Sequence, residues 1–194
     1  MSASSDLQEA IAQLLETPGA LPVEAPVVRR REKEIRSDIE ATDAVHRGMT
    51  IFVMPPLPTS ALQGVSFLFF DAYEVRVRVI ELPDFNDGKD AYEVGEAVAE
   101  AIHWQPTNAI NAEVQAVMTA LSLDQAAALA IVRGNPAFAP FFQLGAMLAH
   151  PISIARRPQE MVEGELALPG FEDNKKMIRV MDVIFNAVLQ VNQP

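Results

Sequence analysis

The sequence contains no cysteine in its 194 residues, and it has few aromatic side chains. Without cysteine the chain has no disulfide bond, no thiolate metal site and no cysteine nucleophile. Aromatic residues make up 7% of the chain, with two tyrosines and a single tryptophan, Trp104. Recognition of single-stranded nucleic acid relies on aromatic side chains that stack on bases, so this composition argues against it.

Positive charge is also scarce, with 15 Lys and Arg against 26 Asp and Glu and a net charge of −11. Because duplex DNA is a dense line of phosphates, we expect no sequence-specific nucleic acid binding. The charge is compatible with an acidic surface that DNA passes without binding to it. The one basic run, Arg29–Arg36, is interleaved with Glu32 and Glu34. An exposed arm of balanced charge explains it better than a track for phosphates.

Long apolar runs are missing as well. The most apolar stretch, residues 126–149, is broken by a charged residue, a glycine, an asparagine and two prolines, which are Arg133, Gly134, Asn135, Pro136 and Pro140. It cannot form a membrane span of about 20 residues. The start of the chain, Met1–Asp6, lacks the basic and apolar regions of a signal peptide. We therefore expect no membrane partner.

Catalytic motifs are not found either. The chain has no P-loop and no G-x-G-x-x-G, and the segment around Ser66 lacks the second glycine of a nucleophile elbow. His46, His103 and His150 lie far apart without a partner at ligand spacing. A pair of carboxylates that meet only in the fold stays open, although no pair is nominated. We predict no catalytic, cofactor-binding or metal residues, and a protein that is not an enzyme.

The acidic turn Asp84–Gly88 has a faint likeness to a calcium-binding loop. An EF-hand loop needs glycine at its sixth position and glutamate at its twelfth. Counted from Asp84, those positions hold Lys89 and Gly95. The turn is therefore interpreted as a solvated connection that leads into a helix, and no metal is expected.

What the chain does have is regular hydrophobic spacing typical of an α+β domain, with 49% hydrophobic residues. A helix is predicted from Ser5 to Glu16, with Ser5 and Gln8 as a capping box. A second, Ala91–His103, starts at Asp90 and Glu93. Strands or extended arms are expected at Val27–Arg36, Met49–Met54, Tyr73–Glu81, Ile152–Arg156 and Met161–Leu168. Within Tyr73–Glu81 the alternation puts valines on one face and charged residues on the other, as in a sheet with one wet face.

The chain divides into three parts. Residues 1–104 and 150–194 are expected to build one α+β core, an antiparallel or mixed sheet with the N-terminal helix and a further helix on one face. Residues 105–149 form an alanine-rich helical insertion. Within it, Ser122 and Gln125 start the second helix, and Gly134 ends that helix as a C′ glycine. The helix before it has one apolar stripe, formed by Ile110, Val114, Val117, Met118 and Leu121.

The last long segment, Ile178–Val191, fits both a strand and a helix. Its β-branched and aromatic residues favour a strand. Together with Tyr73–Glu81, it is long enough to leave sheet edges that a neighbouring subunit would have to pair. Internal positions for both strands are the equal alternative, because sequence does not reveal which strands are edges.

The order of these elements resembles the tail terminator, or tail completion, proteins of tailed phages and related contractile particles. The stretches that carry the resemblance are Leu7–Leu15, Tyr73–Ile102, with its Y-E-V-R-V-R-V strand, and Met177–Val191. They cover about a third of the chain and match as patterns of elements. The insertion at residues 105–149 departs from a minimal terminator.

The resemblance implies a homo-oligomeric ring, typically a hexamer, that caps the tail tube and joins it to the neck or head. Its partners would be further copies of itself and tail tube and neck proteins, with DNA passing through the lumen. The protein would belong to the virion and be assembled in the host cytoplasm, without metal or cofactor. The alternatives are another neck or tube component, or a ferredoxin-like domain that binds or converts a small molecule.

Overall fold

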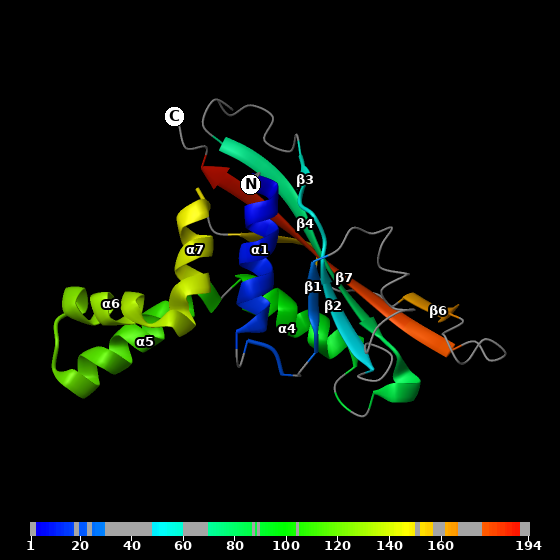
Figure 1. The fold of residues 1–194 in the computed structure, drawn as a ribbon, viewed down its shortest axis with the longest axis horizontal. Helices are drawn as coiled ribbons and strands as arrows, with labels where there is room; N and C mark the ends of the chain where they lie inside the picture. Colours follow the sequence, from blue (N-terminus) through cyan, green and yellow to red (C-terminus); the bar gives the residue numbers. More distant parts are fainter. Residues whose placement is uncertain are drawn as a thin grey trace.

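The computed structural model describes residues 3–17, 20–22, 25–29, 48–59, 70–86, 88, 90–103, 105–149, 152–156, 162–166 and 176–190. Its elements in chain order are α1 (Ala3–Glu16), β1 (Val27–Arg29), β2 (Met49–Val53), β3 (Leu57–Pro58), β4 (Phe70–Glu81), the 3₁₀ turn η1 (Pro83–Phe85), α4 (Ala91–His103), α5 (Gln105–Leu121), α6 (Gln125–Gly134), the 3₁₀ turn η2 (Pro136–Phe138), α7 (Ala139–Met147), β5 (Ser153–Arg156), β6 (Val162–Leu166) and β7 (Lys176–Gln190). The predicted α+β class is confirmed (Figure 1).

The described strands form one seven-stranded sheet in the order β1-β2-β4-β7-β5, with β3 also pairing β4 and β6 also pairing β7. Only β1 and β2 run parallel, so the sheet is mixed. Its centre is the antiparallel pair β4–β7, in register from Phe70 opposite Gln190 to Glu81 opposite Arg179. The strand interpretation of the last long segment is thus confirmed for residues 178–190.

Both long strands are internal. β4 lies between β7 on one side and β2 with β3 on the other, and β7 lies between β4 and the short strands β5 and β6. The possibility that these two strands leave open edges for a neighbouring subunit is therefore wrong. On its outer side, β4 pairs at Tyr73, Glu74 and residues 77–81, and β7 pairs at residues 176–180 and 184–186.

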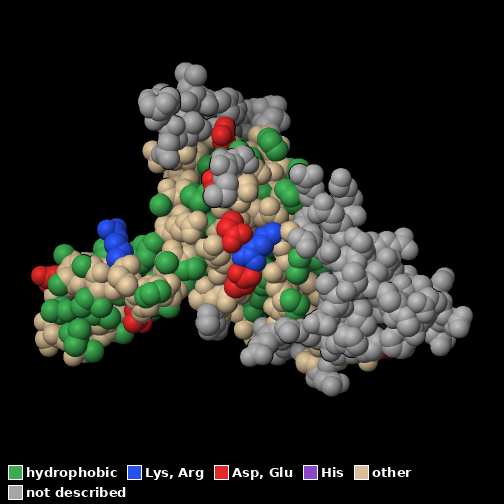
Figure 2. Space-filling view, in the orientation of Figure 1, with side chains coloured by type: hydrophobic (Ala, Val, Ile, Leu, Met, Phe, Trp, Pro, Cys, Tyr) green, Lys and Arg blue, Asp and Glu red, His purple; other side chains and the backbone are tan. Residues whose placement is uncertain are grey.

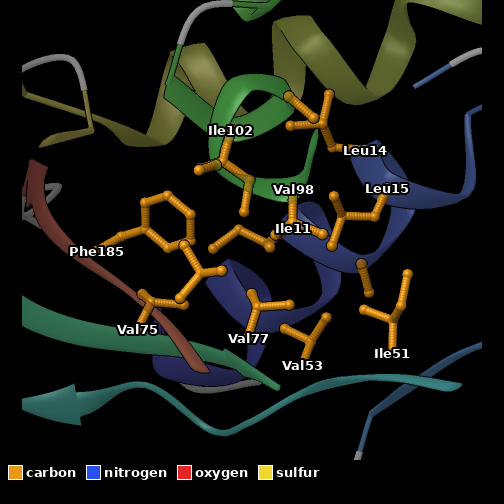
Figure 3. Packing of buried hydrophobic residues seen from close by; sticks show 14 of the residues in the cluster. Ile11, Leu14, Leu15, Ile51, Val53, Val75, Val77, Val98, Ile102 and Phe185 are labelled. Atoms are coloured by element: carbon orange, nitrogen blue, oxygen red, sulfur yellow. The ribbon is translucent and has the colours of Figure 1, made fainter. Parts of the chain in front are cut away.

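The helices α1 and α4 lie on the same face of the sheet and cover it with apolar side chains (Figure 1). On β4 the predicted alternation is confirmed, because Tyr73, Val75, Val77 and Val79 are buried toward the helices. Figure 3 shows how side chains from five elements meet in this core, among them Ile11, Leu14 and Leu15 from α1, Val98 and Ile102 from α4, Ile51 and Val53 from β2, Val75 and Val77 from β4, and Phe185 from β7.

The opposite face of the sheet is only partly wet. Glu74, Arg76 and Arg78 are half-buried there, as predicted from their alternation. Ile80 continues the same outward pattern, yet only 4% of it is exposed, and it packs with Phe52, Met54 and Leu82. One end of this face is thus apolar, which the charged residues alone did not predict.

Local starts and ends of helices differ from the sequence predictions in three places. Helix α1 begins before Ser5, and the Gln8 amide donates to the carbonyl of Val53 at 2.7 Å instead of capping the helix. Helix α6 is capped by Asp124, whose carboxylate accepts from the Ala127 N–H at 2.8 Å, and Ser122 takes a positive φ of 53° in the preceding turn. Gly134 is the last helical residue and lacks the left-handed conformation of a C′ glycine.

The stretch 105–149 divides into two kinds of packing. Helix α7 returns beside α1 and contributes Phe141 and Leu144 to the main core. Helices α5 and α6 form a hairpin that projects at one end of the molecule (Figure 1). The hairpin has its own small cluster of buried residues, Val114, Ala128 and Val132. The α5–α6 hairpin is therefore the part of the insertion that stands outside the core.

Candidate functional surfaces

The histidines and the acidic turn have structural roles wherever they are described. The His103 Nδ1 lies 3.0 Å from the Ile152 carbonyl oxygen, which ties the end of α4 to the start of β5. In the turn, the Asn86 side chain accepts from the Gly88 N–H at 3.1 Å and donates to Glu81 at 2.9 Å. Among the residues that the structure describes, no group of three His, Asp or Glu could hold a metal ion. His46, His150, Ser66 and Trp104 lie outside the described residues.

Glu81 is the one carboxylate that the fold buries deeply among the described residues, with 3% exposure. One oxygen accepts from Asn86 and the other accepts from the Ala91 N–H at 2.9 Å, at the first residue of α4. The Arg179 guanidinium lies 3.8 Å away on the neighbouring strand. A buried carboxylate that accepts from the N-terminus of a helix is favourably placed by the helix dipole. Every one of these contacts holds the β4–α4 corner together, and none leaves the carboxylate open to a substrate.

Arg29 is engaged within the chain. It donates from Nε to Glu9 at 2.9 Å and from Nη2 to Glu16 at 2.8 Å, and a second, short contact joins Nη1 to Glu16. The hydrogen bond from Arg29, and then that from Gln13, holds the pKa of Glu9 below its usual 4.5. The hydrogen bond to Glu16 contributes most to raising the pKa of Arg29 above its usual value. The first residue of the expected basic arm thus fastens β1 to α1, while residues 30–36 lie outside the described part. Basic and acidic side chains gather over α1 and β1 in Figure 2.

The charged strip on the helix-free face of the sheet is internally balanced. Arg78 binds Asp182 across the β4–β7 pair with two hydrogen bonds, 2.7 and 2.9 Å long. Arg76 lies 3.7 Å from Asp182 and 3.7 Å from Glu74. Opposite charges on facing strands stabilise the pair. The strip therefore offers no concentrated charge of one sign to a ligand.

The α5–α6 hairpin presents apolar side chains to solvent. Leu121 is 58% exposed and Ile131 is 45% exposed. On α5, Val114 is buried and Ile110, Val117 and Met118 pack against its cluster, whereas Leu121, the last residue of the expected stripe, is exposed. Hydrophobic side chains cover much of the visible surface of this hairpin (Figure 2).

Charge is nearly missing from this region. Residues 105–149 contain three formally charged side chains, Glu113, Asp124 and Arg133, so ten of the eleven net negative charges lie elsewhere in the chain. Arg133 lies over the Phe142 ring at 5.6 Å. The scarcity of charge in a helical stretch is the sequence signal for this surface. From the sequence we had interpreted residues 105–149 only as an alanine-rich insertion.

Within the described residues no single helix is long and apolar enough to cross a membrane. Residues 109–121 of α5 and helix α6 together have the length and composition of a membrane span, but they are bent by 115° relative to each other. No known protein family model matches the chain, and no curated protein matches it.

Proposed function

We propose that this chain is a structural assembly protein of a virion, a tail terminator-like subunit whose ring caps the tail tube and joins it to the neck or head. Its partners are further copies of itself and tail tube and neck proteins. It acts by contact, and no residue is assigned a catalytic, cofactor-binding or metal-binding role.

The observation that carries the proposal is how the stretches of the family resemblance pack. Leu7–Leu15 lies in α1, Tyr73–Ile102 spans β4 and α4, and the described part of Met177–Val191 lies in β7. Although distant in sequence, they form a single unit, with α1 and α4 on the same face of the central β4–β7 pair (Figures 1 and 3). A helix pair over a strand pair is a fold-level likeness, and fold alone does not define function.

The charge of the chain supports the same proposal. Each subunit carries a net charge of −11. Around a ring this charge repels phosphates, so DNA would pass through the lumen without being held there. A protein that had to read DNA would need the opposite sign.

The ferredoxin-like alternative is less well supported by the order of elements. A ferredoxin-like domain follows the order β-α-β-β-α-β. Here α1 precedes every described strand, and α4 is followed by three further helices before β5. A different neck or tube component shares every feature above and differs only in its position in the particle.

The mass of the full chain in solution tests the ring. Light scattering behind a sizing column, across protein concentration, should give one discrete species close to six times the mass of the chain, and electron microscopy of that peak should show rings with a central hole. A chain that stays monomeric at every concentration, or forms only dimers, contradicts the proposal. Antibody labelling of intact particles then separates a terminator, seen at the junction of tail and head, from a component seen elsewhere.

A further inference from the structure

The long strands that could have left edges for a neighbouring subunit lie inside the sheet. The strands β4 and β7 are internal to the sheet, and Arg29 binds Glu9 and Glu16. Among the described residues, other surfaces are therefore the candidates for a contact between copies. We propose that the α5–α6 hairpin docks on a second copy of this chain; the inference rests on the ring proposed above and names its contact surface.

The first argument is electrostatic. Two copies that each carry a charge of −11 repel one another, and the repulsion is greatest where charged surfaces face each other. The cores of protein interfaces are depleted in charged residues. Residues 105–149 carry a net charge of only −1, so an equally acidic copy can approach this region at low electrostatic cost.

The second argument is exposure. Leu121 and Ile131 are large apolar side chains that are 58% and 45% exposed, on a hairpin whose buried cluster contains just Val114, Ala128 and Val132. Short helices with so little buried surface gain most of their stability from tertiary packing. Docking would remove both side chains from water.

The third argument is position. The hairpin lies at one end of the molecule's longest axis, and the start of β7 with β6 lies at the other (Figure 1). A closed ring needs a contact between two different patches of each subunit, repeated around the axis. A protrusion at one end of the subunit reaches the next copy in such a repeat.

The chain offers a closely matched control for a mutational test. The test variant is Leu121→Glu with Ile131→Glu, and the control variant is Leu57→Glu with Tyr92→Glu. Leu57 and Tyr92 are 61% and 43% exposed and lie outside the hairpin and the start of β7, so both double variants replace similarly exposed large side chains and add the same charge. Circular dichroism and thermal unfolding of each variant show that it folds.

Light scattering across concentration gives the outcome. We expect the wild type and the control variant to form the same assembly, and the hairpin variant to need at least about tenfold more protein to assemble, since burying one large apolar side chain contributes about that factor. A hairpin variant that assembles like the wild type overturns the hairpin contact but leaves the ring standing. Equal loss in both variants also overturns it, because charge alone would then explain the effect. A monomeric wild type rejects both the contact and the ring.

A membrane surface is the other occupant that the composition of the hairpin allows, and it is tested in parallel. The wild-type chain is mixed with vesicles of phosphatidylcholine and phosphatidylglycerol and floated through a density gradient. Under the proposal the protein stays at the bottom. Flotation that the hairpin variant loses and the control variant keeps would overturn docking on a second copy.

Discussion

At the scale of single residues, the buried hydroxyl of Thr50 is the least satisfied group in the described part of the chain. Thr50 is 3% exposed, and its Oγ1 has no hydrogen-bond partner there. It sits on β2 opposite Ile80, beside the apolar end of the helix-free face. A buried hydroxyl without a partner costs roughly 1–3 kcal/mol in lost hydration.

Replacing this hydroxyl by a methyl group should stabilise the fold. We predict that Thr50→Val raises the free energy of unfolding by about 1 kcal/mol, because the penalty for the unsatisfied hydroxyl disappears while the shape stays similar. The measurement is urea unfolding followed by circular dichroism. Thr119→Val is the control, since the Thr119 hydroxyl is exposed and donates to the Gln115 carbonyl at 2.9 Å. If Thr50→Val destabilises the chain instead, the hydroxyl has a partner in the folded protein.

At the scale of elements, the side chain of Arg29 links the short strand β1 to helix α1 through hydrogen bonds to Glu9 and Glu16. Its guanidinium, 28% exposed, faces two carboxylates that are each a little under half exposed. Exposed ion pairs contribute little singly, but one guanidinium that binds two carboxylates has a more fixed geometry than an isolated pair. This contact decides where β1 lies against α1.

The contribution of Arg29 should depend on pH. We predict that Arg29→Met lowers the free energy of unfolding by about 1 kcal/mol at pH 7. The pKa of Glu9 is lowered in the folded state, so this stabilisation is present above the usual carboxylate pKa of 4.5 and is lost as pH falls through the lower folded value. Urea unfolding of wild type and variant from pH 7 to pH 3 measures the difference.

A second variant keeps this test specific. Arg76→Met removes a guanidinium of similar exposure, 33%, whose nearest carboxylates are 3.7 Å away. Its effect should be smaller at every pH. A difference between wild type and Arg29→Met that stays constant down to pH 3 would show that packing of the arginine stem, and not its charge, holds β1.

Elements with a local signal could be predicted from the sequence. The alternation of β4 and the apolar stripe of α4 are properties of neighbouring residues, and both were found with their faces correct. The cap of α6 was misplaced because Ser122 and Asp124 are both good N-cap residues two positions apart, and only the three-dimensional turn selects Asp124.

Features that depend on distant partners could not be predicted. The pairing of β4 with β7 decides that both long strands are internal, and nothing near either strand encodes it. Leu121 continues the periodic stripe of α5 but is 58% exposed, because periodicity gives the side of the helix and not whether another element covers it. The lack of charge in residues 105–149 can be seen in the sequence, but it marks a candidate surface only because the α5–α6 hairpin projects from the core.

At the scale of the whole molecule, net charge opposes association and apolar surface favours it. Salt shortens the screening length from about 10 Å at 0.1 M to about 3 Å at 1 M. We predict that added sodium chloride lowers the protein concentration at which the chain assembles, because it screens the repulsion between copies that each carry −11 and leaves an apolar contact intact.

Light scattering at several salt concentrations measures this dependence. Sodium sulfate at equal ionic strength serves as a comparison, and it should promote assembly further because it also strengthens apolar burial. Dissociation on adding sodium chloride would mean that ion pairs hold the copies together, which is incompatible with a contact made by the charge-poor hairpin.

The central position of β7 also bears on how the chain is made. Arg78 on β4 and its partner Asp182 on β7 are 104 residues apart. A ribosome adding about 5–20 residues per second needs roughly 5–20 s to travel between them. During that interval Val75, Val77 and Val79 have been synthesised, but the strand that completes their sheet has not. The main core therefore closes only after β7 has been synthesised, and until then the apolar face of β4 lacks its partner strand.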